Sequence, residues 1–372
     1  MKILLDPQTY NEQKFGGISR YYTEVYIELK KMQGVKIECP IVYSDNLHLK
    51  EHRLFDSCWN KFLLSKLFKR KARARHLKRM KEKNFERTEQ ALKKQDFDVF
   101  VATYYNPYFL GNLGEKPYVL TVYDMIHEVL PQYFPNDGYL VQRKKLLIEK
   151  AATIIAISES TKKDILRFYP QIDPLKITVI YLAQSINIDK IVAVDLPENY
   201  ILFVGNRTIY KNFTFFIKTV APILKSNPEI FVVCAGGNRF EAYEEELLRN
   251  LGIYEQVIQR NFADHELASY YSGARCFVFP SEYEGFGIPI LEAMACGCPV
   301  LLANHSSFPE VAGTAGVYFE LNNPEDLYDK LIRLLTNIHL RNEYALEGLK
   351  QSKKFSWQKT AEQCLQVYRS VI

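Results

Sequence analysis

Two glutamates eight residues apart, Glu284 and Glu292, flank a loop that contains two glycines. The segment that begins at Phe279 runs Phe-Pro-Ser-Glu-Tyr-Glu-Gly-Phe-Gly-Ile-Pro. An apolar strand is predicted to end at Phe279, and a helix is predicted to begin near Pro289 and to carry Glu292 in its first turn. Glycines and a helix start both offer backbone N–H groups to a ligand. The pattern therefore predicts a binding site with one acid on a loop and one on a helix.

A second loop carries two cations four residues apart. Residues 205–212 run Gly-Asn-Arg-Thr-Ile-Tyr-Lys-Asn and follow the apolar run 200–204, so that Arg207 and Lys211 come directly after a predicted strand. Two cations that converge on a pyrophosphate would neutralise the charge that grows on a departing nucleotide. A solvated basic loop is the weaker alternative, since ligands of open parallel sheets bind at the carboxyl ends of strands. The loop lacks the G-x-x-x-x-G-K-[ST] order of a Walker loop.

A third glycine loop lies near the N-terminus, where residues 16–20 run Gly-Gly-Ile-Ser-Arg. Gly16 and Gly17 would let the backbone approach a ligand closely. Ser19 could cap the following helix, and Arg20 could pair with a phosphate at its positive end. A glycine-rich turn with a solvated arginine remains an equal alternative. No G-x-G-x-x-G sequence occurs here, which disfavours a dinucleotide dehydrogenase.

The elements that must position these loops alternate between short apolar runs and longer amphipathic ones, which is typical of βαβ units and a parallel sheet. Helices are predicted over Ser19–Lys31 and Gly138–Ala151, and 185–197 is predicted to be a linker. The predicted strands are Lys2–Asp6, Val35–Val42, Phe97–Ala102, Tyr118–Tyr123, Thr153–Ile157, Ile177–Ile180, Tyr200–Val204, Ile230–Ala235, Val257–Arg260, Ala274–Phe279, Pro299–Ala303 and Gly316–Phe319.

The glutamate segment resembles the E-x7-E signature of the family-4 retaining glycosyltransferases. Four further segments match that family in the expected order: the glycine loop 15–20, the I-S-x-x-[ST] turn at 157, the G-x-R-x-x-K-N donor loop at 205–212, and the P-E-x-x-G turn at 309–313. These matches cover nearly the whole chain. The resemblance implies an α/β protein of GT-B fold, with two Rossmann-like, doubly wound parallel-sheet domains that face a central cleft.

The resemblance also implies roles for individual residues. Arg207 and Lys211 would hold the diphosphate of a nucleoside diphosphate sugar, Glu292 would accept hydrogen bonds from the ribose, and Glu284 would position the transferred sugar. Arg20 would face either the donor or the acceptor. Backbone contacts with the donor would come from Gly16, Gly17, Gly205, Phe286, Gly287 and Ile288.

The domains implied are an acceptor-binding domain over 1–185, completed by a C-terminal helix at about 355–372, and a donor-binding domain over 186–354. The reaction implied is retaining, metal-independent transfer of a hexosyl group to a hydroxyl of a saccharide or lipid-linked saccharide, in polysaccharide or lipopolysaccharide assembly. No cofactor is expected beyond the donor substrate. The alternatives are a nucleotide-sugar epimerase of the same fold and a non-catalytic sugar-binding protein.

One departure from the family concerns the strand that ends near Tyr123. Many members carry a histidine at that position, whereas here Tyr123-Asp124-Met-Ile-His127 follows the strand. Asp124 and His127 are polar groups at a strand end and are expected to face the cleft. His127 could orient an acceptor hydroxyl or could only brace the loop, and the two interpretations weigh equally.

Positive charge is concentrated in residues 61–83, which hold eleven Lys and Arg against the single acid Glu82 and include several apolar residues. An interfacial helix on anionic lipid is favoured over a solvated helix and over nucleic-acid binding. The chain has no membrane-length apolar run and its seven cysteines form no C-x-x-C pair, so a cytoplasmic protein without a metal site is expected. Asp96-Phe-Asp98 precedes a strand and is interpreted as a turn.

Overall fold

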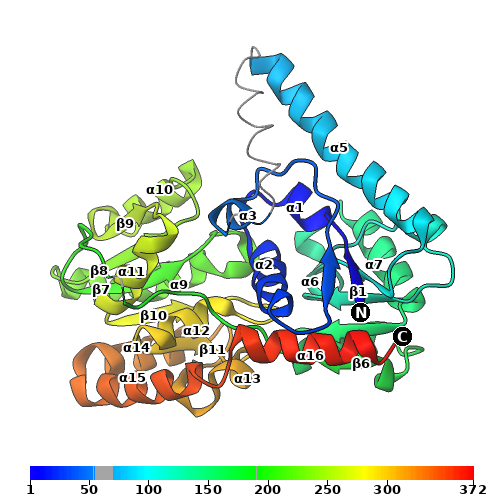
Figure 1. Cartoon of the computed structure of the whole chain (residues 1–372). Helices are drawn as coiled ribbons and strands as arrows, with labels where there is room; N and C mark the ends of the chain where they lie inside the picture. Colours follow the sequence, from blue (N-terminus) through cyan, green and yellow to red (C-terminus); the bar gives the residue numbers. More distant parts are fainter. Residues whose placement is uncertain (53, 55–69, 190) are drawn as a thin grey trace. The chain divides into compact units, whose positions relative to one another are not determined.

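The computed structural model describes residues 1–52, 54, 70–189 and 191–372, and Figure 1 draws the chain. The described chain divides into two compact units. Unit 1 comprises Met1–Ile157, Thr161–Leu182 and Trp357–Ile372, and unit 2 comprises Ser158–Ser160 and Ala183–Ser356. The predicted linker 185–197 contains no helix or strand among its described residues. It is tied to unit 2, because the hydroxyl of Ser269 donates to the carbonyl of Val192 at 2.7 Å.

Unit 1 is built on a six-stranded parallel sheet with the order β2-β1-β3-β4-β5-β6. The central strands β3, β4 and β5 are buried along their whole length, as expected for a parallel sheet covered by helices on both faces. The strands are β1 (Lys2–Leu5), β2 (Lys36–Glu38), β3 (Val99–Ala102), β4 (Tyr118–Val122), β5 (Thr153–Ala156) and β6 (Ile177–Val179). The helices are α1 (Gln8–Glu12), α2 (Gly17–Lys30), α3 (Leu47–Glu51), α5 (Arg70–Lys94), α6 (Ile126–Val129), α7 (Gly138–Lys150), α8 (Glu159–Phe168) and α16 (Trp357–Arg369), with 3-10 turns η1 (Leu110–Asn112), η2 (Pro131–Tyr133) and η3 (Pro174–Lys176).

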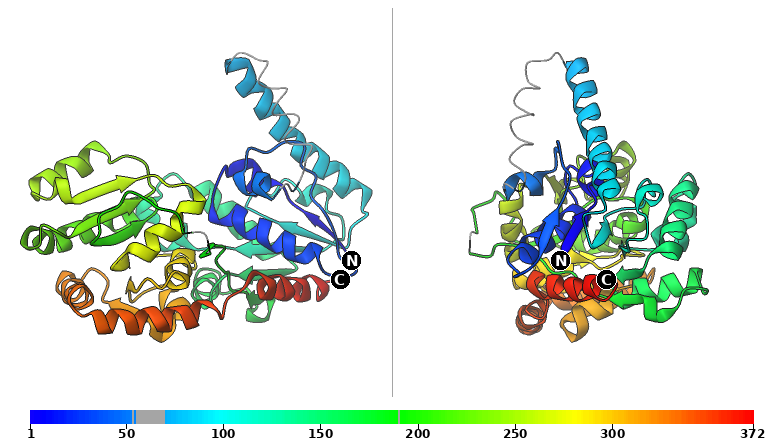
Figure 2. Two further views of the ribbon diagram at one scale, coloured as in Figure 1. Left: turned by 60° about the vertical axis from the view of Figure 1, so that its left-hand side comes forward. Right: turned by 45° about the vertical axis from the view of Figure 1, so that its right-hand side comes forward.

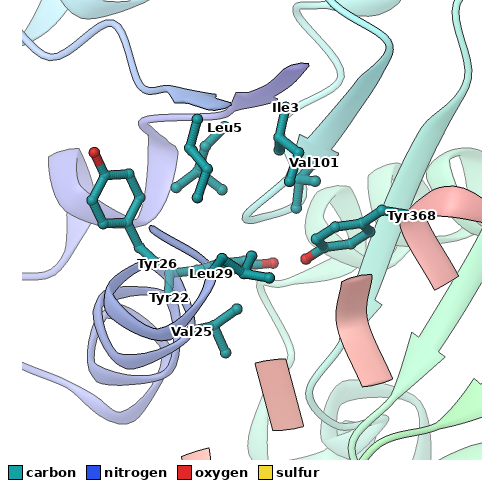
Figure 3. Close-up of a pocket in the computed structure, with 9 residues that line it drawn as sticks. Ile3, Leu5, Tyr22, Val25, Tyr26, Leu29, Val101 and Tyr368 are labelled. Carbon is teal, nitrogen blue, oxygen red and sulfur yellow. The ribbon is translucent and has the colours of Figure 1, made fainter. Parts of the chain in front are cut away.

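The last helix, α16, belongs to unit 1 and packs on α2 (Figure 1). The hydroxyl of Tyr21 on α2 lies 3.3 Å from the sulfur of Cys364 on α16. A small apolar cavity lies between the two helices and the sheet, and Figure 3 shows Tyr22, Val25, Val101 and Tyr368 around it. Because this space is small and its lining is almost wholly apolar, it is a packing defect rather than a ligand site.

Unit 2 is built on a second six-stranded parallel sheet, with the order β12-β11-β10-β7-β8-β9. Its strands are β7 (Tyr200–Val204), β8 (Phe231–Ala235), β9 (Val257–Arg260), β10 (Cys276–Phe279), β11 (Val300–Ala303) and β12 (Gly316–Phe319). Figure 2 shows α14 and α15 lying side by side, and α15 packs on α12. The helices are α9 (Phe213–Ser226), α10 (Ala242–Asn250), α11 (Leu267–Gly273), α12 (Ile288–Ala295), α13 (Phe308–Ala312), α14 (Pro324–Thr336) and α15 (Ile338–Ser352), with 3-10 turns η4 (Ile209–Lys211), η5 (Tyr254–Gln256), η6 (Asp264–Glu266) and η7 (Gly313–Ala315).

All twelve predicted strands exist, and the fold class is confirmed. The second strand was predicted too long: it ends at Glu38, two residues before Pro40, which has no N–H to continue the ladder. The predicted turn at Asp96–Asp98 precedes β3, and the carboxylate of Asp98 accepts from the N–H of Lys2 at 2.7 Å.

The start of α2 differs from the prediction. The helix begins at Gly17, with Gly16 as its N-cap, so Ser19 lies inside the first turn and does not cap it. The Ser19 hydroxyl instead donates to the carbonyl of Gly16 at 3.0 Å. The acceptor for the Ser19 N–H is the side chain of Gln13, at 3.0 Å. The side chain of Gln13, three residues before the cap, therefore accepts from one of the N–H groups that have no partner within the helix.

Candidate active site

The predicted site residues divide between the two units. Those of the donor loop and the glutamate segment lie at the carboxyl ends of β7 and β10 in unit 2. At the end of β7 the chain turns at Gly205, where φ is +104°, a value that favours glycine. The Gly205 N–H donates to the carbonyl of Ala235 at 2.9 Å, which fastens the start of the donor loop to the end of β8.

Arg207 is buried, and each of its three guanidinium nitrogens donates a hydrogen bond. Its Nε donates to Glu244 at 2.8 Å, and its Nη2 donates to the second carboxylate oxygen at 3.2 Å. The remaining N–H groups reach the carbonyls of residues 236–239 at 3.0 to 3.4 Å. The guanidinium also lies 4.8 Å from the ring centroid of Phe240. Arg207 therefore holds the loop after β8 against the loop after β7.

Lys211 on the donor loop (205–212) and Glu284 on the loop between β10 and α12, the glutamate loop, form an ion pair. The two side chains are 18% and 16% exposed, so solvent and ligands can reach the pair. The Lys211 ammonium also lies 5.0 Å from the ring of Tyr210 and 5.6 Å from that of Phe279. Burial lowers the pKa of Lys211, but the Glu284 carboxylate and Tyr210 outweigh burial and raise it above its ordinary value. Lys211 is therefore a cation at neutral pH.

Two serines after β11 bind the backbone of the loop that carries Glu284, which lies between β10 and α12. The hydroxyl of Ser306 donates to the carbonyl of Glu284 at 2.5 Å and accepts from its N–H at 3.3 Å. The buried hydroxyl of Ser307 reaches the carbonyls of Glu284 and Phe286 at 3.0 and 2.8 Å. The backbone of the loop is thereby fixed, and the Glu284 side chain extends from it to Lys211.

Helix α12 begins at Ile288, one residue earlier than predicted, with Gly287 at φ +99° as its N-cap. Glu292 is the fifth residue of the helix, so it lies in the second turn and not in the first as predicted. Its side chain is buried, and one carboxylate oxygen accepts from the hydroxyl of Tyr271 at 3.2 Å. Burial and the nearby Glu292 charge raise the pKa of Tyr271 well above its ordinary value, so this phenol stays protonated and donates.

In unit 1 the glycine loop carries Arg20 on the first turn of α2. Its guanidinium lies 5.6 Å from the ring centroid of Phe15, which in turn contacts the ring of His48 at 5.0 Å. Burial and the charge of Arg20 lower the pKa of His48 to about 4, so His48 is neutral at physiological pH. The loop therefore presents one cation, Arg20, beside an exposed aromatic ring.

Asp124 and His127 lie together at the carboxyl end of β4, as their positions predict. Asp124 accepts from the N–H of Ile126 at 3.1 Å, and His127 Nε2 lies 3.4 Å from the carboxylate of Asp137. Burial and the Lys144 ammonium lower the pKa of His127, so its ring is neutral. Within the part of the chain that the structure describes, its buried Nδ1 has no hydrogen-bond partner.

Tyr123 takes no part in this polar group. Its side chain is buried, its hydroxyl donates to the carbonyl of Thr103 at 2.8 Å, and its N–H donates to the hydroxyl of Tyr105 at 3.2 Å. The tyrosine that replaces the family's histidine is therefore a packing residue that ties the end of β4 to the end of β3.

Sequence reasoning missed an acid at the end of β1. Asp6 is fully buried and accepts from the N–H groups of Gln8 and Thr103 and from the hydroxyl of Tyr108, at 2.8 to 3.2 Å. Burial raises its pKa to about 7, against the lowering effect of these donors. Its place directly after a strand was the available signal. Glu244, which pairs with Arg207, and the two serines that bind the backbone of Glu284 lie far from these residues in the sequence, so no local pattern indicated them.

The comparisons with known proteins bear on both units. The family model "Glycosyltransferase Family 4" matches residues 15–183, and the model "Glycosyl transferases group 1" matches residues 184–351. The O-antigen chain mannosyltransferase B of Escherichia coli is 28% identical over 297 residues, which cover 75% of this chain and 77% of the relative.

Two solved structures share the fold over the whole chain. Sucrose-phosphate synthase from Thermosynechococcus elongatus superposes with a TM-score of 0.74 at 20% identity and covers 100% of this chain and 98% of its own. HepE of Anabaena in complex with UDP and glucose gives a TM-score of 0.74 at 16% identity, with 100% of both chains covered.

Two parallel-sheet α/β units, with loops that carry glycines, acids and cations at the carboxyl ends of their strands, have the GT-B fold. The family models extend over nearly all of the chain. The chain belongs to glycosyltransferase family 4, and two of its relatives are named O-antigen chain mannosyltransferases.

Proposed function

We propose that this enzyme transfers a hexosyl group from a nucleoside diphosphate sugar to a saccharide hydroxyl, with retention at the anomeric carbon and without a metal ion. The observation that carries the proposal is the accessible pair of Lys211 and Glu284 at the carboxyl ends of β7 and β10. Lys211 supplies positive charge for the leaving diphosphate, and the N–H groups at the start of α12 add to it. Glu292, fixed by Tyr271, is the acceptor for the ribose hydroxyls.

The reaction proceeds by departure of the nucleotide and attack of the acceptor on the same face. Catalysis then rests on orientation and on stabilisation of the leaving diphosphate, and no side chain is needed as nucleophile. Glu284 positions the transferred sugar from a loop whose backbone the two serines hold. Arg207 serves the site through its loop contacts, because its guanidinium is buried against Glu244 and backbone carbonyls.

The donor proposal is tested by a thermal-shift screen of the whole protein against UDP-, GDP-, ADP- and dTDP-sugars. We expect one family of donors to raise the melting temperature, and NMR of the product should show the anomeric configuration of the donor retained. An inverted product would contradict retention. Binding without transfer to any saccharide acceptor would favour the sugar-binding protein, and interconversion of the free donor would favour the epimerase. If no donor bound, the proposal would be wrong.

The acceptor is proposed to bind unit 1 at the carboxyl ends of β3 and β4. Tyr139 at the start of α7 is 65% exposed, and the guanidinium of Arg143 lies 3.9 Å from its ring centroid. Burial, together with the charges of Asp124, Glu12 and Asp137, raises the pKa of Tyr104 to about 12.

Two buried nitrogens in this region, His127 Nδ1 and Arg143 Nε, have no hydrogen-bond partner among the described residues. Because Nε2 of the neutral His127 ring faces the Asp137 carboxylate, Nδ1 is left as an acceptor, whereas Arg143 Nε is a donor. An exposed aromatic ring beside acids and polar groups of both kinds suits a sugar, which has an apolar face and hydroxyls that both donate and accept. The set Tyr139, Arg143, Asp124 and His127 is therefore the proposed acceptor site.

The change Tyr139→Ala tests this assignment. It should raise the KM for the acceptor about tenfold and leave the donor Kd unchanged, because a stacked ring in a binding site contributes on the order of 1–2 kcal/mol. The matched control is Tyr243→Ala, which removes an equally large ring that is 57% exposed on α10 of unit 2. Equal effects of the two changes on the acceptor KM would refute the acceptor site.

The basic segment 61–83 is proposed to contact anionic lipid. Residues 61–69 lie outside the described residues, and the rest forms the first half of α5. The second half of this helix packs on unit 1 through Asn84, Thr88 and Leu92, which are buried at four-residue intervals. The first half projects away from the unit (Figure 1), and its Arg75, Lys78 and Arg79 are exposed.

A helix with this much exposed positive charge is attracted to anionic headgroups. Among the described helices, none is long and apolar enough to cross a bilayer. The expected association is therefore peripheral, at a cytoplasmic membrane face, and it would bring the enzyme to a lipid-linked acceptor.

The triple change of Arg75, Lys78 and Arg79 to Ala should reduce co-sedimentation with vesicles that contain anionic phospholipid about tenfold or more, since each cation near the surface contributes about 1 kcal/mol. The control changes Arg87, Lys93 and Lys94 to Ala, which removes the same charge from exposed positions in the other half of the same helix. If both variants lost the same amount of binding, or neither lost any, the assignment of the first half of α5 would fail.

A further inference from the structure

Lys211, the cation proposed for the donor diphosphate, is already paired with a carboxylate. Lys211 on η4 is paired with Glu284, and the backbone around the pair is fixed on both sides. The carbonyl of Tyr210 accepts from the N–H of Glu282 at 2.8 Å, so the two loops are joined just beside the pair. Ser306 and Ser307 fix the backbone on the other side of Glu284.

A diphosphate and a carboxylate compete for the same ammonium group. Both are oxyanions, and the diphosphate carries the greater charge, so it is the stronger partner for a lysine. The Glu284 carboxylate can leave, because the pair is partly exposed and only its side chain has to rotate. The rings of Tyr210 and Phe279 keep the ammonium in place when its partner changes.

We infer that donor binding is an exchange reaction at Lys211: the diphosphate of the donor displaces Glu284, and the released carboxylate then turns to the transferred sugar. This inference rests on the proposed function and adds an order of events to it. Glu284 is the partner of Lys211 that the diphosphate replaces. It becomes available to the sugar only after the diphosphate has arrived, so a free sugar does not engage it.

The exchange has a consequence for binding of nucleoside diphosphates that carry no sugar. These ligands must displace Glu284 from Lys211, and they have no sugar for the released carboxylate to contact. The change Glu284→Gln removes the competing charge and should tighten binding of such a nucleotide about fivefold, the gain expected when a partly exposed ion pair no longer occupies the binding group. Transfer activity should fall in the same variant, because the sugar has lost its positioning residue.

The experiment is calorimetric titration of the whole protein with UDP, GDP, ADP and dTDP. The nucleotide that the unchanged protein binds best is then used for the variants. Glu282→Gln is the matched control, since it removes an acid of the same loop and leaves the ion pair of Lys211 with Glu284 intact. It should change the Kd less than twofold. In a Lys211→Ala background, Glu284→Gln should no longer tighten binding, because the competition has been removed.

Each outcome decides one of two questions. If the unchanged protein binds none of the four nucleotides, the proposed donor function fails. If it binds one of them but Glu284→Gln leaves the Kd unchanged or weakens it, the exchange is refuted while the donor function stands. Equal tightening by Glu282→Gln, or tightening that persists without Lys211, would also refute the exchange.

Discussion

Replacement of Arg207 by Ala should destabilise unit 2 as well as impair donor binding. The guanidinium and the Glu244 carboxylate are 3% and 2% exposed, so the change leaves a buried carboxylate without its cation. Breaking a buried ion pair in this way costs about 3–5 kcal/mol. In a unit of this size each kcal/mol lowers the melting temperature by about 2–4 °C, so a fall of about 6–20 °C is expected.

The double variant Arg207→Met, Glu244→Met separates this structural role from ligand contact. Two apolar side chains of similar length remove the unpaired charge, and replacement of a buried pair in this way is often neutral in stability. The carbonyls of residues 237–239 still lose their donor, although 238 and 239 are exposed enough for water to replace it. We expect the double variant to recover about half of the lost melting temperature.

Differential scanning calorimetry of both variants, with donor titration at a temperature where each is folded, provides the measurement. If Arg207 acted only as a direct ligand of the diphosphate, Arg207→Ala would leave the melting temperature within about 2 °C of the unchanged protein and would abolish donor binding. That result would refute the reasoning from the buried network.

Three smaller changes extend the test to other residues. Tyr123→Phe should lower the free energy of unfolding by about 1 kcal/mol, the value of one hydrogen bond, and leave kcat/KM within twofold; a large kinetic loss in steady-state assays would return Tyr123 to the substrate site. Gly237→Ala should weaken donor binding strongly, because its Cβ would lie 2.5 Å from a backbone oxygen of the donor loop, whereas the control Gly34→Ala has a similar φ with open space around it and should affect only stability. Burial raises the pKa of Asp6 to about 7, so the folded state holds a proton that the unfolded state releases near pH 4. Stability from this group is therefore present at low pH and is lost as the pH rises from about 4 to 7, by up to a few kcal/mol, and denaturant titrations of Asp6→Asn should show a flatter pH dependence.

The positions of the strands and loops were predictable because the signals are local. Apolar runs in a parallel sheet are continuous, so β7, β10 and β11 end where the sequence predicts. The glycines at 205 and 287 both have positive φ, as their places at a strand end and a helix start require. The same local signals correctly placed Lys211 and Glu284 on loops at the carboxyl ends of strands.

Partners across the sequence were not predictable, because nothing local specifies them. Glu244 lies 37 residues after Arg207, and it has the appearance of an ordinary acid in the first turn of α10. Tyr123 stands where the family has a functional histidine, and only its hydrogen bond to Thr103 shows that it is turned inward. Ser19 had the right residue type for a cap, but the helix already begins at Gly17.

The two cations of the donor loop illustrate how burial decides what a residue can do. The sequence pattern of Arg and Lys four residues apart suggests equal roles for the two cations, and in the structure each is paired with an acid. The pair Arg207 and Glu244 is almost inaccessible, whereas Lys211 and Glu284 are each exposed by about one sixth. Separating the first pair costs several kcal/mol, and separating the second costs on the order of 1 kcal/mol, which a bound diphosphate exceeds. Arg207 is therefore committed to the fold of the loop, and Lys211 is the cation that can exchange its partner for the substrate.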